Sequence, residues 1–311
     1  MALQIRTAAT IELPTTIKMM VYGQAGMGKT TLALSMPQPL LLDFDGGVAR
    51  VNSNHLDGVA VAQISRWEEA LELFNTDLSP FKTVIVDTAG KMMDMILTYR
   101  CGNRQPKLNE WGGINSEFNN FTRGLSNLGK NVIYVAHRES TKDGDNQVYI
   151  PMLRSKSFTS IVTELDLLGY LEMRQINGRV ERTITFNPTE RSEGKNACNL
   201  PGMMAIPTII DGKGNPTGPN NFLEENVLNP YLTMLKTKRD TQQAYAEALK
   251  SLKEEIEAVT DAETANQFVA NLDSYKGKNN LYAKARQMFS ARVKELPIKY
   301  NAEKKCYEPA A

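Results

Sequence analysis

The sequence predicts an α/β protein with a mostly parallel sheet and a β-hairpin at one edge, followed by a C-terminal α-helical region. Three observations support this class. Apolar runs of strand length alternate with helical stretches in the first half, a glycine-rich turn follows the first run, and the chain beyond Asn229 is rich in helix-forming residues. Continuous β-branched runs are typical of strands covered on both faces, which favours a parallel sheet.

The predicted elements follow from these runs and from the turns between them. The predicted strands are Ile17–Tyr22, Pro39–Phe44, Thr83–Asp87 and Asn131–Ala136. The predicted helices are Lys29–Met36, Ser65–Phe74, Thr88–Arg100 and Glu117–Leu128. Beyond Leu165, two further apolar runs flank Asn177-Gly178, a pair that favours a tight turn. These two runs predict the antiparallel hairpin at one edge of the sheet.

A segment dense in Gly, Pro, Asn and Asp predicts a linker before the helical region. Residues 211–221 read DGKGNPTGPNN, which can sustain neither a helix nor a strand ladder. We therefore predict a core over residues 1–220 and a helical extension over residues 221–311. The amphipathic helices of the extension are expected to pack against the core, with binding of DNA or of a partner protein as alternatives.

Composition excludes several classes of protein. The 311 residues contain 36 Lys+Arg and 35 Asp+Glu, so the net charge of +1 provides no overall positive field for nucleic acid. The three cysteines lie far apart without a C-x-x-C pair, which argues against a disulfide framework or a zinc site. No apolar run approaches the ~18 residues of a membrane span, and the N-terminus lacks a secretion signal. We expect a cytoplasmic protein without membrane contact.

The glycine-rich turn is a phosphate-binding motif. Residues 23–30 read GQAGMGKT and match G-x-x-x-x-G-K-[ST] between a predicted strand and a predicted helix. Successive backbone N–H groups of such a loop form a nest for a triphosphate. Lys29 is expected at the β and γ phosphates and Thr30 at Mg²⁺, so ATP and Mg²⁺ are the predicted cofactors. The predicted nucleotide-binding residues are Gly23, Gln24, Ala25, Gly26, Met27, Gly28, Lys29, Thr30 and Thr31.

Polar residues end three of the predicted strands, at the rim of the sheet where ligands bind. Asp87 ends an apolar strand and is the expected partner of Mg²⁺ through water. Asp45 is the candidate for activating the attacking water and Asp43 is its reserve, unless both only cap the turn. His137 is expected to contact the γ-phosphate and to transmit its loss, with a purely local hydrogen bond as the alternative.

Taken in order, the motifs resemble those of a known family. They are GQAGMGKT, LLDFDGG, KTVIVDTAG, EWGG, VIYVAHRES and GKNACNLPG. This set resembles phage-encoded RecA-like ATPases of the single-strand annealing recombinase family, within the RecA and RadA superfamily, over residues 15–210. The resemblance implies a RecA-like P-loop core that binds single-stranded DNA beside a single-strand DNA-binding protein. It also implies annealing or strand exchange in the cytoplasm of a bacterial host.

The resemblance also assigns roles to positions. Asp45 falls where the RecA group has a water-activating glutamate, and this shorter carboxylate implies slow hydrolysis. His137 falls where the group has a glutamine that relays the nucleotide state. Residues 138–156 correspond to its second DNA-binding loop, with a mobile surface hairpin as the alternative. The predicted DNA-binding cations are Arg138, Lys142, Arg154 and Lys156.

Residues 190–196 resemble a segment whose cations reach the nucleotide of the neighbouring subunit in RadA-like and DnaB-like relatives. Lys195 matches this pattern, whereas Ala197 stands where those relatives have arginine, and Arg191 is the possible substitute. A residue that acts on a neighbour requires a ring or filament of identical subunits, so a homo-oligomer is expected.

Two hypotheses about function follow from the sequence. The first is an ATP-dependent recombinase or annealing protein that binds single-stranded DNA and hydrolyses ATP in a slow, DNA-dependent reaction. The second is a nucleotide-gated DNA-binding or assembly module with little ATP turnover. A P-loop kinase for a small molecule is disfavoured, because the sequence has no Arg-rich lid motif.

Overall fold

The computed structural model describes residues 13–176 and 178–310 of the chain, apart from the side chains of residues 155 and 156. Its strands are β1 (Lys18–Gly23), β2 (Pro39–Asp43), β3 (Ala60–Gln63), β4 (Thr83–Asp87), β5 (Asn131–Asp143), β6 (Asn146–Pro151), β7 (Leu167–Ile176), β8 (Arg179–Thr185), β9 (Lys195–Asn196), β10 (Met203–Ile206), β11 (Ile298–Asn301) and β12 (Cys306–Pro309). Its α-helices are α1 (Lys29–Ala33), α2 (Trp67–Leu71), α3 (Ala89–Cys101), α4 (Trp111–Ser126), α5 (Ser155–Glu164), α6 (Asn229–Glu257), α7 (Ala262–Asn271) and α8 (Leu281–Glu295).

The main sheet has the order β10-β8-β7-β1-β5-β4-β2-β3. The six strands from β7 to β3 are parallel, and the predicted hairpin of β7 and β8 extends the sheet antiparallel, with β10 outside it. In this register Gly23 pairs with His137, and Asp87 pairs with Asp43. The ends of β1, β5, β4 and β2 therefore meet at one rim, which is where the predicted chemistry lies.

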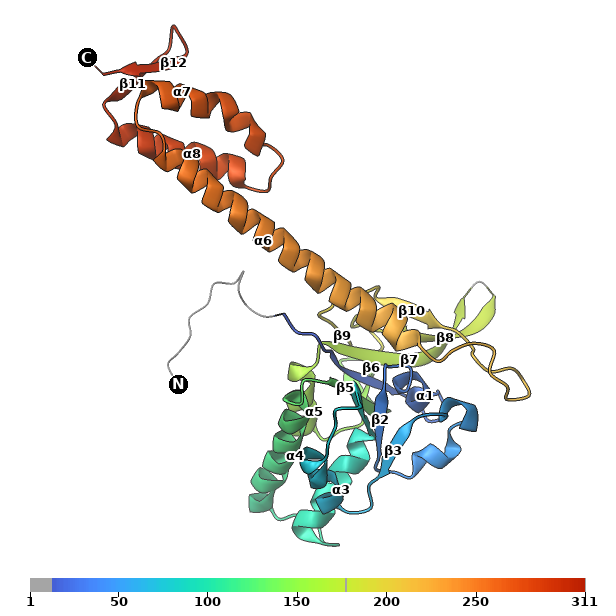
Figure 1. Ribbon diagram of the computed structural model, residues 1–311. Coiled ribbons are helices and arrows are strands. Elements are labelled where there is room, and N and C mark those ends of the chain that lie inside the picture. Colours follow the sequence, from blue (N-terminus) through green and yellow to red (C-terminus); the bar gives the residue numbers. More distant parts are fainter. Residues whose placement is uncertain (1–12, 177, 311) are drawn as a thin grey trace. The chain divides into compact units, whose positions relative to one another are not determined.

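Helices cover both faces of this sheet, which is why its central strands are apolar throughout (Figure 1). On one face α2, α3, α4 and α5 pack on a core that includes Trp67, Phe118 and Phe121. On the other face, α1 and the segment after Phe222 provide the cover, and the Leu223 N–H donates to the Ser35 hydroxyl. The predicted α/β class with a mostly parallel sheet is confirmed.

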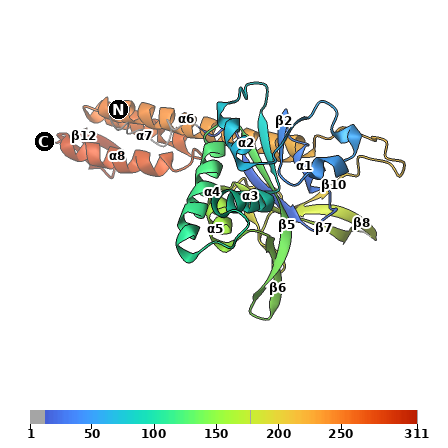
Figure 2. The same cartoon turned by 90° about the horizontal axis from the view of Figure 1, so that it is seen from below.

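Several boundaries differ from the sequence expectation. The strand β5 continues past Ala136 to Asp143 and pairs with β6, so the segment after His137 is a β-hairpin (Figure 2). The edge strand β3 has no counterpart among the predicted strands because its burial alternates and its run is short. The helix α4 begins at Trp111 rather than Glu117, since two glycines in its first turn weaken the helical pattern.

The described chain divides into two compact units, and the division falls between Thr233 and Met234, inside α6. The C-terminal unit is helical, as predicted, and has a core of its own that includes Leu252, Phe268 and Phe289. The antiparallel pair β11 and β12 was not predicted. Within the described residues, no helix is both long and apolar enough to cross a membrane.

Candidate nucleotide site and the adjoining cavity

The loop between β1 and α1 has the backbone of a phosphate nest. Gly26 and Gly28 adopt φ values of 77° and 75°, a left-handed conformation that favours glycine. Gly23 is required for a different reason, because a Cβ at this position would lie 2.6 Å from the Leu171 carbonyl oxygen of β7. Glycine at these positions therefore lets the loop curl tightly against the sheet.

Lys29 begins α1 and points into the loop that precedes it. Its side chain is 6% exposed, and Nζ donates a hydrogen bond of 2.8 Å to the Gln24 carbonyl oxygen. Burial lowers the pKa of Lys29, whereas the carboxylates of Asp87 and Asp45 raise it. A buried ammonium whose hydrogen bond goes to a neutral carbonyl can pair with the negative charge of a phosphate.

Thr30 and Asp87 lie together, as a magnesium site requires. The Thr30 hydroxyl donates to the Asp87 Oδ2 at 2.5 Å. Burial raises the pKa of the Asp87 carboxyl to about 6; the Thr30 hydrogen bond opposes this rise, and the Asp45 and Asp43 charges add to it. A hydroxyl and a carboxylate fit Mg²⁺, which usually takes few protein ligands and completes its shell with water and phosphate oxygens. When bound, Mg²⁺ would neutralise charge on the phosphates.

The two aspartates at the end of β2 and in the turn after it, Asp43 and Asp45, have different environments. The Asp43 carboxylate accepts hydrogen bonds from the N–H groups of Gly47 and Val48 at 2.9 and 3.2 Å, so it caps the turn. The Asp45 carboxylate instead pairs through Oδ2 with Arg50 at 3.6 Å, and its buried Oδ1 has no hydrogen-bond partner in the described chain. One aspartate is therefore structural, and the other has an oxygen free for a ligand.

These groups surround a cavity of about 410 Å³. Its walls include the phosphate loop from Ala25 to Thr31, Met27 excepted, together with Asp45, Asp87 and His137. The rest of the lining is Gly47, Arg50, Val51, Asn52 and Thr88. Thus the structure brings together the loop and all three predicted strand-end residues. The sequence analysis did not identify Arg50, because no local sequence pattern indicates that this arginine pairs with Asp45.

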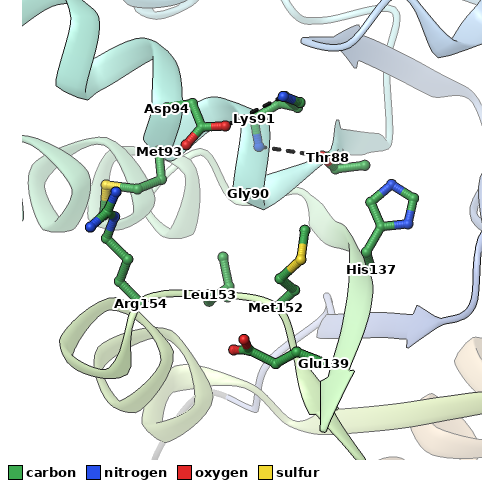
Figure 3. Close-up of a pocket in the computed structure, with 10 residues that line it drawn as sticks. All are labelled: Thr88, Gly90, Lys91, Met93, Asp94, His137, Glu139, Met152, Leu153 and Arg154. Atoms are coloured by element: carbon green, nitrogen blue, oxygen red, sulfur yellow. Dashed lines mark hydrogen bonds and ion pairs between the residues drawn. The ribbon is translucent and has the colours of Figure 1, made fainter.

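A second cavity of about 340 Å³ shares lining residues with the first, and Figure 3 shows the residues around it. Both are lined by Thr88 and His137, and the second extends between the start of α3 and the segment Met152–Arg154. His137 is half-buried, and burial lowers its pKa, with the Lys29 charge acting in the same direction. A neutral imidazole therefore stands between the two cavities at neutral pH.

The predicted DNA-binding cations occupy different parts of the β5–β6 hairpin and its base. Arg138 is partly buried and contacts other side chains: it donates to the Gln24 side chain at 3.1 Å and to the Tyr170 hydroxyl, and lies over the Tyr149 ring. Lys142 is exposed near the tip, and exposed Arg154 lies over the Trp111 ring. The Lys156 side chain lies outside the described residues.

Lys195 does not line the nucleotide cavity of this chain. It belongs to β9, which pairs with the start of β7, and Nζ donates to the carbonyl oxygens of Val162 and Thr163 at 2.9 and 3.0 Å. Arg191 is exposed in a segment whose backbone pairs with Tyr149 of β6. Neither cation lines the cavity in the described chain.

The fold and this site are those of a P-loop ATPase, a class of nucleotide-binding proteins. Residues 15–198 match the family described as an AAA domain, and the chain belongs to that family. Among solved structures it is similar to a KaiC-like protein from the hyperthermophilic archaeon Pyrococcus horikoshii OT3. That similarity has 10% identity and a TM-score of 0.37, and it covers 61% of this chain and 89% of that chain. No curated protein matches the sequence.

Proposed function

We propose that the protein is an ATPase of the RecA type that binds single-stranded DNA under the control of ATP and works as an assembly of identical subunits. One observation carries the proposal. His137 lines both the nucleotide cavity and the cavity at the base of the β5–β6 hairpin. A change at the γ-phosphate therefore has a direct route to the hairpin that carries the exposed Lys142.

The DNA part of the proposal is supported by chemistry at the hairpin. Its tip is polar, and Arg154 at its base is exposed beside an aromatic ring. Lysine and arginine contact phosphates without sequence preference, and aromatic rings can stack with bases. A recombinase or annealing protein needs this kind of sequence-independent contact. The hydrolysis part is supported by Asp45, whose Oδ1 has no hydrogen-bond partner within the described part of the chain and can orient or deprotonate a water.

The test is ATP hydrolysis measured with and without single-stranded DNA, together with DNA binding measured with and without a slowly hydrolysed ATP analogue. We expect DNA to accelerate hydrolysis and ATP to strengthen DNA binding. Lys29→Ala should lose both effects, because the phosphate charge is left unpaired. Lys82→Ala is the matched control, since this exposed lysine precedes β4 at the opposite end of the strand from Asp87.

Three other results would change the conclusion. An unchanged hydrolysis rate with ATP-dependent DNA binding would identify a nucleotide-gated module with little turnover. No DNA binding in any nucleotide state would reject the recombinase proposal. Normal ATP affinity in Lys29→Ala would reject the nucleotide site itself.

A further inference from the structure

The strand β8 brings a guanidinium against the phosphate loop. A Cβ built on Gly28 would lie 2.7 Å from Nη1 of Arg182, so the arginine contacts the glycine that precedes Lys29. Arg182 is held in place by its strand, where it pairs with Met173 of β7 and Ile206 of β10. Nothing in the sequence pattern marks this arginine, because the contact joins two segments far apart in the chain.

This guanidinium has no partner in the part of the chain that the structure describes. Burial is the only influence on the pKa of Arg182, which it lowers, and no ion pair or hydrogen bond joins the side chain to a described residue. Arg174 on the neighbouring strand, in contrast, pairs with Glu172. A half-buried cation without a counter-ion is costly, so an anion from outside the chain is the expected partner.

The surroundings of Arg182 indicate which part of a nucleotide it would contact. It lines a cavity of about 100 Å³ with Thr31 and Leu32 of α1. It does not line the cavity of Asp45 and Asp87, whereas Thr31 lines both. The guanidinium therefore approaches the phosphate loop on a side without the carboxylates assigned to water and Mg²⁺.

We propose that Arg182 is a phosphate ligand for the nucleotide bound to its own subunit and contacts the phosphates that ATP and ADP share. The proposal rests on the proposed nucleotide site. A guanidinium presents several N–H donors in a fixed fork and suits phosphate oxygens, which the single ammonium of Lys29 cannot fully satisfy. Arg182 would add a second positive charge, beside that of Lys29, at the phosphate loop and would take no part in the transfer of the γ-phosphate.

If Arg182 contacts only the phosphates that ATP and ADP share, it should contribute equally to the binding of both nucleotides and should not accelerate hydrolysis. Arg182→Ala should weaken ATP and ADP by the same factor, about 10- to 100-fold for a hydrogen bond to a charged group. The KM for ATP should rise with kcat unchanged, because the interaction is equal in ground state and transition state. Arg182→Ala should also bind inorganic pyrophosphate more weakly than the wild-type protein does, since Arg182 would contact only phosphates.

The experiment is calorimetric titration of full-length protein with Mg²⁺ and ADP, a slowly hydrolysed ATP analogue or pyrophosphate. The matched control is Arg179→Ala, an exposed arginine on the same strand. Thermal unfolding without nucleotide separates binding from structure. Loss of an unpaired, half-buried charge should leave the melting temperature unchanged or raise it, whereas a structural arginine would lower it.

The outcomes separate this inference from the proposed function. A wild-type protein that binds no nucleotide overturns the nucleotide site, and the role of Arg182 with it. A wild-type protein that binds while Arg182→Ala binds equally well, or loses only ATP, overturns the role of Arg182 alone. If Arg182→Ala does not fold, Arg182→Lys and Arg182→Gln replace it, and affinity should fall from arginine to lysine to glutamine. Equal affinities would contradict the proposal.

Discussion

Two aspartates that the sequence presents as near equivalents have different roles at the scale of single residues. Asp43 satisfies the N–H groups of Gly47 and Val48, whereas Oδ1 of Asp45, which lies beside the nucleotide cavity, has no hydrogen-bond partner among the described residues. We expect Asp45→Asn to bind ATP normally and to lower kcat by about 10²- to 10⁴-fold, the usual contribution of a general base. Single-turnover hydrolysis and nucleotide titration measure these two quantities separately.

Asp43→Asn is the matched control for this prediction. Its amide can accept only one of the two hydrogen bonds, so we expect a loss of about 1 kcal/mol in the free energy of unfolding, measured by denaturant titration. The assignment is wrong if Asp43→Asn abolishes hydrolysis in a fully stable protein while Asp45→Asn remains active.

We expect Asp87 to make the binding of Mg²⁺ and ATP dependent on pH. Its pKa of about 6 in the nucleotide-free protein lies above the ordinary value of 3.8. The stability that this raised pKa contributes is fully present below 3.8 and is lost as the pH rises through about 6. Mg²⁺ needs the ionised carboxylate, so nucleotide affinity should increase over the same interval.

This dependence is measured by titrating ATP at fixed free Mg²⁺ across the interval. In Asp87→Asn the nucleotide still titrates but residue 87 does not, so the pH profile of ATP affinity in this variant is the baseline. Identical profiles for the two proteins would refute the assignment of Asp87 to the metal.

At the scale of elements, the Arg138 side chain connects the β5–β6 hairpin to the phosphate loop. Arg138 lies over the Tyr149 ring and donates to the Gln24 side chain. Given the proposed DNA binding, Arg138→Ala should leave DNA-free hydrolysis nearly unchanged and reduce its stimulation by DNA roughly tenfold, the value of one lost charged contact. Hydrolysis rates at saturating DNA measure this effect.

Lys142→Ala is the control within the same hairpin, because Lys142 is exposed near the tip. It should weaken DNA binding but leave the rate at saturating DNA unchanged. Equal behaviour of the two variants would indicate that Arg138 contacts DNA and does not couple the hairpin to the loop.

The elements also indicate what a single sequence can predict. Three elements were predicted because a local sequence pattern indicates each of them: the phosphate loop, the strand ending at Asp87 and the β7–β8 hairpin. The extension of β5 was missed because its polar half gains order from pairing with β6. The positions of Arg50 and Arg182 could not be predicted, since each depends on contacts between distant or irregular segments.

At the scale of the whole molecule, Lys195 tests the proposal that neighbouring subunits share a nucleotide site. Within one subunit its Nζ binds the last carbonyls of α5, which caps that helix. Its removal should therefore cost about 1 kcal/mol of stability in any assembly state. To contact a nucleotide bound to a neighbouring subunit, Lys195 would have to give up its hydrogen bonds to the α5 carbonyls or alternate between these carbonyls and the nucleotide. A stability measurement alone does not detect such a contact.

Mixing the Lys29→Ala and Lys195→Ala variants separates the two roles of Lys195. Lys29→Ala cannot hold nucleotide but still carries Lys195, whereas Lys195→Ala holds nucleotide but cannot assist a neighbour. If Lys195 acts on the next subunit, an equimolar mixture should hydrolyse ATP at about a quarter of the wild-type rate, because half the subunits bind ATP and half of those have a competent neighbour. A mixture that only sums the two separate rates would leave Lys195 as a helix cap, and the same mixture diluted until it is monomeric should show no gain.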